Sequence, residues 1–142
     1  MPFIVNHIHL KSSDPKATAD WFVEAFNVEI VADDVRSVGD RFIKTMTEGG
    51  LTINISGERT GETLGPADAE PHYGLEHFGF DTDDMNADLE RLQGLGAELK
   101  EGPIPNAAGG AIAFIAAPGG IRIELIKQSQ AAGIPQRPRR SD

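Results

Sequence analysis

Apolar residues in this chain recur with two different periods, and these periods predict its secondary structure. Alternation at every second residue predicts half-buried β-strands, whereas recurrence at every third and fourth residue predicts amphipathic helices. Strands are predicted at residues 3–11, 28–32, 41–46 and 51–56, and again at residues 75–82, 97–100, 111–116 and 121–126. Helices are predicted from Asp14-Pro15 to Phe26 and from Asp83 or Asp84 to Gly96. The order strand, helix, three strands therefore occurs twice.

The chemistry of the chain repeats together with this order. His7 and His77 are 70 residues apart, and each is followed seven positions later by an aspartate that can cap a helix. Glu124 lies 47 residues after His77, and Asn54 lies 47 residues after His7. Each half therefore places a metal-ligand residue type, or its amide analogue, at the same two positions, which indicates an internal repeat.

The last strand of each half is predicted to have one apolar and one polar face. Thr52 and Asn54 alternate with isoleucines in the first half, as Arg122 and Glu124 do in the second. By the same alternation, His7 and His9 point to one side of their strand. A sheet with one face covered by a helix and a polar second face is suited to line a water-filled cavity.

The predicted fold class is α+β, with two tandem βαβββ modules at about residues 3–56 and 73–127. Residues 57–72, rich in Gly, Pro, Glu, Thr and Ala, are predicted to be a linker or a loop over a site. The two modules together form a single predicted domain, residues 1–127. The polar residues 128–142 are predicted to be a poorly ordered tail.

The composition of the chain argues against several classes of binding partner and limits the possible metal ligands. A net charge of −9 argues against binding to nucleic acid or to an anionic membrane surface. No apolar run approaches the roughly 18 residues of a membrane span, and no signal peptide opens the chain, so a cytoplasmic location is expected. The chain has no cysteine, so a metal would have to be held by His, carboxylate or amide groups.

These features resemble the vicinal oxygen chelate superfamily, which includes glyoxalase I, methylmalonyl-CoA epimerase, extradiol dioxygenases, and fosfomycin-resistance and bleomycin-binding proteins. The resemblance rests on the two His-to-Asp spacings, on Trp21-Phe22 in the first helix, and on the stretch from Ala117 to Leu125. It implies that the modules form a curved mixed sheet, a cup around a divalent metal ion, with the helices on the outer face. It also implies a homodimer that acts on a small-molecule substrate.

In this resemblance, His7, His77 and Glu124 match the metal-ligand positions of the family. Asn54 occupies the remaining position, where glyoxalase I has Glu, the epimerase has Gln and the extradiol enzymes use no ligand. It is expected either to bind the metal or to hydrogen-bond a metal-bound water. Oxygen and nitrogen ligands without thiolate suit Fe, Mn, Ni, Co or Zn.

Three functions remain open at this point. The first is a glyoxalase-like lyase or isomerase, with Glu124 as ligand and catalytic base. The second is a ring-cleaving or other Fe(II) dioxygenase, with His9 as the acid/base group, although His9 could also be structural. The third is a metal-free small-molecule binding or resistance protein. Thr52 and Arg122 are candidate substrate contacts, and Arg122 could instead pair with Glu124.

Overall fold

A computed structural model describes residues 2–128, so nearly all of the predicted tail lies outside the described residues. This part of the chain forms two compact units, residues 2–65 and 66–128, which we call module 1 and module 2. Each module is described by itself, because their positions relative to one another are not determined.

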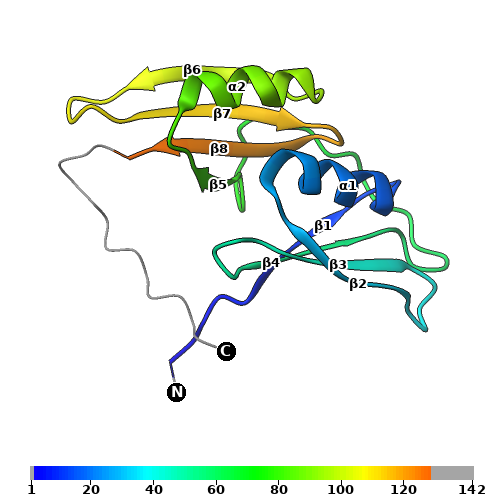
Figure 1. The fold of residues 1–142 in the computed structure, drawn as a ribbon. Helices are drawn as coiled ribbons and strands as arrows, with labels where there is room; N and C mark the ends of the chain where they lie inside the picture. The colour runs from blue at the N-terminus through cyan, green and yellow to red at the C-terminus, as the bar shows by residue number, and fades with distance from the viewer. Residues whose placement is uncertain (1, 129–142) are drawn as a thin grey trace. The chain divides into compact units, whose positions relative to one another are not determined.

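Module 1 contains one helix and a four-stranded mixed sheet (Figure 1). Its elements are β1 (His7–Lys11), α1 (Pro15–Phe26), β2 (Glu29–Val35), β3 (Arg41–Met46) and β4 (Thr52–Ser56). The strands are ordered β1-β4-β3-β2, with β1 and β4 parallel and the other pairs antiparallel. The predicted helix start is confirmed, because the Asp14 carboxylate accepts a hydrogen bond from the Ala17 N–H at 3.1 Å. The helix ends at Asn27, which has a left-handed φ of 53°.

Module 2 repeats this arrangement (Figure 1). Its elements are β5 (Phe78–Asp81), α2 (Met85–Gly94), β6 (Glu98–Pro105), β7 (Ala111–Ala117) and β8 (Ile121–Lys127). The strands are ordered β5-β8-β7-β6, with β5 and β8 parallel. Asp84, one of the two predicted caps, accepts a hydrogen bond from the Ala87 N–H at 3.1 Å. The two βαβββ modules are thus confirmed as two four-stranded mixed sheets.

The strand registers confirm the 70-residue repeat. Lys44 pairs with Asn54 between β3 and β4, and Phe114 pairs with Glu124 between β7 and β8. The parallel pairs match as well, since His9 lies beside Asn54 and Gly79 lies beside Glu124. Asn54 and Glu124 therefore occupy equivalent positions in their sheets.

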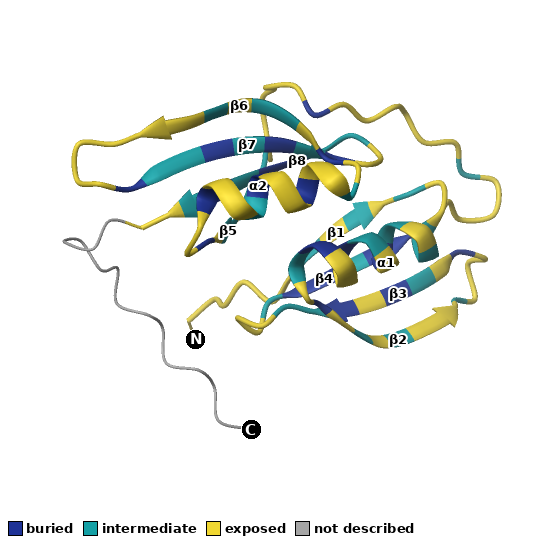
Figure 2. Ribbon diagram, turned by 45° about the horizontal axis from the view of Figure 1, so that its top comes forward, coloured by how far each residue is buried: buried dark blue, intermediate teal, exposed yellow. Residues whose placement is uncertain are grey.

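In each module the helix packs on one face of its own sheet. Helix α1 contacts β2, β3 and β4, and helix α2 contacts β6 and β8. The buried residues on these faces are Phe22, Ile43, Ile53 and Ile55 in module 1, and Leu89, Leu92, Ile115, Ile123 and Leu125 in module 2. Buried positions concentrate in the inner strands and on one side of each helix (Figure 2). The residues between them in β4 and β8, including Asn54 and Glu124, occupy the opposite face.

Several predicted boundaries differ from the structure. Strand β1 begins at His7 instead of residue 3, and β2 extends to Val35 instead of residue 32. Strand β6 extends to Pro105, whereas the sequence predicts a strand only at residues 97–100. It is an edge strand with register shifts before Ile104, and an edge with such irregularities accommodates proline. Strand β5 begins at Phe78 instead of Leu75, so His77 directly precedes the strand. No helix among residues 2–128 is long and apolar enough to span a membrane.

Candidate metal centre

His77 and Glu124 lie side by side in module 2. Glu124 belongs to β8, and His77 directly precedes β5, the parallel neighbour of β8. The His77 Nε2 atom is 3.0 Å from Glu124 Oε2, and both side chains are partly buried. Two ligand atoms that are each about 2.1 Å from one ion, at right angles, are about 3.0 Å apart. The pair thus has a separation that suits two ligands of one ion as well as a hydrogen bond.

The other ring nitrogen of His77 also has a partner. Nδ1 lies 2.9 Å from Glu76 Oε1. The hydrogen bond with His77 lowers the pKa of the Glu76 carboxyl, and the charges of His77 and Arg122 lower it further. The Phe114 ring meets the imidazole edge-on, with the ring centres 5.0 Å apart. These contacts fix the orientation of the imidazole.

Arg122 is enclosed by groups of its own module, with 7% of the residue exposed. It donates hydrogen bonds to the Ala69 carbonyl at 3.0 Å and to Glu101 Oε2 at 3.4 Å. Its Nε lies 3.0 Å from Glu76 Oε1 in an ion pair that lacks hydrogen-bond alignment. The guanidinium carbon is also 4.4 Å from the centre of the Phe114 ring. Arg122 therefore lies against Glu76 and Phe114, both of which contact His77.

In module 1, the positions equivalent to Arg122 and Glu124 carry the uncharged residues Thr52 and Asn54. His7 is exposed at the start of β1, and its Nδ1 is hydrogen-bonded to the side-chain oxygen of Asn6. Thr52 lies beside His7 in the parallel register and is buried. Asn54 Oδ1 is buried and has no hydrogen-bond partner among residues 2–128. An unpaired buried oxygen costs about 1–3 kcal/mol, so this atom is suited to an external partner.

His9 has a separate set of contacts on the same face of module 1. Its Nε2 lies 2.7 Å from the Ser56 hydroxyl oxygen, and its ring meets Phe42 edge-on with centres 5.4 Å apart. Burial lowers the pKa of His9, and the nearby charge of Lys11 lowers it further. These effects favour a neutral imidazole, which can accept a proton as an acid/base group must.

The predicted ligands are thus divided between the two modules. Within module 2 the structure brings His77 and Glu124 together, while His7 and Asn54 belong to module 1. Among residues 2–128, no three His, Asp or Glu side chains are grouped as a metal site. The residues present nonetheless fit a metal in their chemistry, because the His77–Glu124 spacing suits two ligands and Asn54 Oδ1 lacks a partner.

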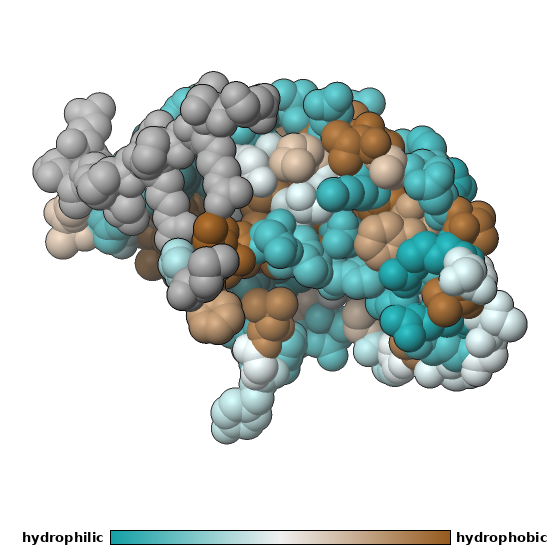
Figure 3. Space-filling model, turned by 90° about the horizontal axis from the view of Figure 1, so that it is seen from below, coloured by the Kyte–Doolittle hydropathy of each residue, from teal (hydrophilic) through white to brown (hydrophobic). Residues whose placement is uncertain are grey.

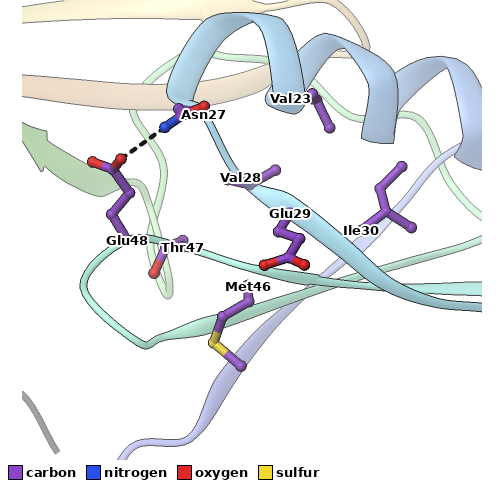
Figure 4. Close-up of a pocket in the computed structure, with 8 residues that line it drawn as sticks. All are labelled: Val23, Asn27, Val28, Glu29, Ile30, Met46, Thr47 and Glu48. Atoms are coloured by element: carbon purple, nitrogen blue, oxygen red, sulfur yellow. Dashed lines mark hydrogen bonds between the residues drawn. The ribbon is translucent and has the colours of Figure 1, made fainter.

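A pocket of about 600 Å³ lies elsewhere in module 1, where α1 leads into β2 (Figure 4). A hydrogen bond of 2.7 Å joins Asn27 to Glu48 at its rim. The lining residues are Val23, Asn27, Val28, Glu29, Ile30, Met46, Thr47 and Glu48. None of them is a predicted site residue, so this pocket is separate from the candidate metal ligands.

Sequence reasoning missed Glu76, Glu101 and Phe114. Phe114 could have been found from the sequence, because it pairs with Glu124 across the two strands predicted at residues 111–116 and 121–126. No pattern identifies Glu76 as the partner of His77, since neighbouring residues in a regular strand point to opposite faces. The contact is possible because the chain at both residues has not yet entered β5.

Comparison with solved structures shows the same fold. A glyoxalase family protein from Bacillus cereus aligns with a TM-score of 0.77 and 18% identity, covering 86% of this chain and 91% of that one. The fosfomycin resistance protein FosX from Listeria monocytogenes, solved with Mn(II) and sulfate, aligns with a TM-score of 0.69 and 20% identity, covering 92% and 97%. TnmS3, an antibiotic-binding protein from Streptomyces sp. CB03234, aligns with a TM-score of 0.64 and 24% identity, covering 90% and 98%.

No curated protein matches the sequence. The sequence model of the glyoxalase/bleomycin resistance protein/dioxygenase superfamily matches residues 4–125. This match spans both modules, and it agrees with the paired βαβββ fold and with the structural relatives. The chain therefore belongs to the glyoxalase/bleomycin resistance protein/dioxygenase superfamily.

Proposed function

We propose that this protein is a divalent-metal-dependent enzyme that binds a small substrate through two adjacent oxygen atoms and acts as a lyase or isomerase. His7, His77 and Glu124 are the proposed ligands. The observation that carries the proposal is the 3.0 Å separation of His77 Nε2 and Glu124 Oε2. The unpaired Asn54 oxygen supports it from the other module.

The donor set limits the choice of metal and leaves room for substrate. Two imidazoles and one carboxylate suit Fe, Mn, Ni, Co or Zn and leave coordination positions open, as a catalytic site requires. The FosX structure contains Mn(II), which makes manganese a sensible first ion to test. Asn54 would bind the metal directly or accept a hydrogen bond from a metal-bound water.

When bound, the metal would polarise the chelated substrate oxygens and stabilise negative charge that develops on them. Glu124 would take the proton, since an amide at the equivalent position cannot be protonated at neutral pH. Proton transfer would therefore occur on one side of the substrate only. Thr52 and Arg122 are the proposed substrate contacts.

Two other functions remain as alternatives. In an Fe(II) dioxygenase, His9 would be the acid/base group, and its lowered pKa and contact with the Ser56 hydroxyl favour that use. In a metal-free binding protein, the same face would hold a small molecule without chemistry. We also propose that the two modules act as one domain and that the protein is a cytoplasmic homodimer.

Metal analysis of the purified protein tests the proposal. Wild type should contain stoichiometric metal, whereas His7→Ala, His77→Ala and Glu124→Ala should each lose most of it and stay folded. His72→Ala is the matched control, because His72 is exposed and its ring contacts the neighbouring Tyr73 carbonyl. Equal metal content in all these proteins would refute the ligand assignment.

Activity assays then separate the alternatives. Proton exchange next to a substrate carbonyl would support the lyase or isomerase, and oxygen consumption with catechols would support the dioxygenase. A wild-type protein without metal that binds small molecules would support the binding protein.

A further inference from the structure

The residue immediately before each proposed histidine ligand contacts that histidine. In module 1, the Asn6 side-chain oxygen is hydrogen-bonded to His7 Nδ1. In module 2, Glu76 Oε1 lies 2.9 Å from His77 Nδ1. Asn6 and Glu76 are 70 residues apart, so they are equivalent positions of the repeat. Two independent modules therefore place a side-chain oxygen at the same ring nitrogen.

This contact determines which nitrogen can bind a metal. A neutral imidazole carries one proton, and an acceptor at Nδ1 holds the proton there, leaving the lone pair of Nε2 free. In module 2, Nε2 is the atom that faces Glu124. The preceding residue thus turns the metal-binding nitrogen of His77 toward the other proposed ligand of its module.

At both of these positions, module 1 has a neutral amide where module 2 has a carboxylate. Module 1 carries amides at both positions, Asn6 beside the histidine and Asn54 at the second ligand position. Module 2 carries carboxylates at both positions, Glu76 and Glu124. A carboxylate acceptor makes the imidazole a stronger metal ligand than an amide does. His77 is therefore the better ligand of the two histidines.

Arg122 forms an ion pair with the Glu76 carboxylate. Its Nε lies 3.0 Å from the same Glu76 oxygen that contacts His77, and the guanidinium also donates hydrogen bonds to Glu101 and to the Ala69 carbonyl. The Phe114 ring contacts both Arg122 and His77. The side chains form a connected series from the buried guanidinium to the imidazole.

We propose that Glu76, held by Arg122, is a positioning residue that fixes the proton of His77 on Nδ1 and directs Nε2 to the metal. This inference rests on the proposed metal site. Nothing in the repeat or in the ligand assignment by itself requires a carboxylate at position 76.

The test compares Glu76→Gln with Glu101→Gln. Each substitution removes one carboxylate partner of Arg122 without changing the length of the side chain, but only the first removes the carboxylate that contacts His77. Metal-free proteins are titrated with Co(II) by calorimetry, and thermal unfolding checks that each variant is folded. We expect Glu76→Gln to weaken Co(II) binding by about 10- to 100-fold, and Glu101→Gln to bind close to the wild-type value.

A spectroscopic measurement separates positioning from a general loss of negative charge. In the Co(II) protein, the exchangeable Nδ1 proton of His77 should give a shifted proton resonance that exchanges slowly with water. This resonance should be lost or broadened in Glu76→Gln and retained in Glu101→Gln.

The outcomes distinguish this inference from the proposed function. Wild-type protein that does not bind Co(II) would overturn both. Wild-type protein that binds Co(II), with equal affinity and an equal His77 resonance in the two variants, would overturn only the role of Glu76.

Discussion

Asn54 and its equivalent Glu124 differ in charge and in their contacts. The Asn54 Oδ1 atom is buried without a partner in the described part of the chain, whereas Glu124 contacts His77. A buried oxygen that lacks a partner is unfavourable for stability. Such an unpartnered oxygen is suited to an external partner, and substitution of Asn54 tests this.

Replacing Asn54 with Glu should therefore tighten metal binding, because it adds an anionic ligand beside the first three. It would also close a coordination position, so a dioxygenase would lose activity while a glyoxalase-type activity would persist or rise. Calorimetry with Mn(II) and assays of both reactions measure these effects. Asn54→Leu, of similar size but without a ligand atom, is the control and should not tighten binding. Unchanged affinity and turnover in Asn54→Glu would show that Asn54 does not face the metal.

Asp40 is a second residue whose environment supports a prediction, in this case on pH. It is 1% exposed, and hydrogen bonds from Arg36 are the main cause that lowers its pKa from 3.8 to about 2. Lys11, with Nζ 3.8 Å away, adds to the effect. A lowered carboxyl pKa means that the folded state binds this proton less readily than the unfolded state does.

The stabilisation from Asp40 should therefore be complete above its ordinary pKa and should disappear as the pH falls from 3.8 to about 2. Denaturant unfolding of wild type and Asp40→Asn at several pH values measures this difference. The wild type should be more stable than Asp40→Asn at neutral pH. The difference between their free energies of unfolding should vanish as the pH approaches the lowered pKa of Asp40. A difference in the free energy of unfolding that stays constant across this pH range would contradict the stabilising role of ionised Asp40.

At the scale of elements, the turn between β7 and β8 lies close to the chain segment that contacts Arg122. Gly119 and Gly120 both have positive φ angles, 97° and 76°. A Cβ atom at position 120 would lie 2.7 Å from the Ala67 carbonyl oxygen, whereas one at position 119 would contact nothing within 4 Å. The segment near Ala67 also includes the Ala69 carbonyl that accepts a hydrogen bond from Arg122.

Gly120→Ala should consequently be more destabilising than Gly119→Ala. Both substitutions carry the strain of a positive φ, so the difference between their free energies of unfolding isolates the backbone clash. We expect this clash to cost a further ~1–3 kcal/mol. Chemical denaturation of the two variants provides the comparison. Equal losses would show that the 66–69 segment moves away without cost.

At the scale of the whole molecule, strongly exposed apolar side chains precede an edge strand in each sheet. Phe3 and Val5 precede β1, and Tyr73 and Leu75 precede β5, at equivalent positions of the repeat. They are between 75% and 104% exposed. Elsewhere, on the surface drawn in Figure 3, apolar side chains are interspersed with polar ones. Exposed apolar residues beside open sheet edges favour association with another chain.

We therefore expect a homodimer with a two-fold axis. Sedimentation at micromolar concentration should give about twice the chain mass of 15.2 kDa. Phe3→Glu combined with Tyr73→Glu should shift the protein toward the monomer. Val38→Glu, at a 42% exposed position in the turn between β2 and β3, should not. A wild-type mass of one chain would refute the expectation.

The sequence alone determined the repeat, the order of the elements and most of their boundaries. Helix caps at Asp14 and Asp84 and the period-two strands depend on interactions between residues close in the chain, which local patterns record. The 47-residue offset also predicted correctly that Asn54 and Glu124 occupy equivalent positions. The ligand assignment itself remains a prediction.

Only the tertiary structure decided the partners of the charged groups. Arg122 was expected to contact a substrate or Glu124, but its position brings Glu76, Glu101 and the Ala69 carbonyl within reach. Glu76 meets His77 because the chain there has not yet entered the regular strand. Such contacts depend on register shifts, turns and chain direction over many residues, and no periodic pattern of apolar and polar residues encodes them.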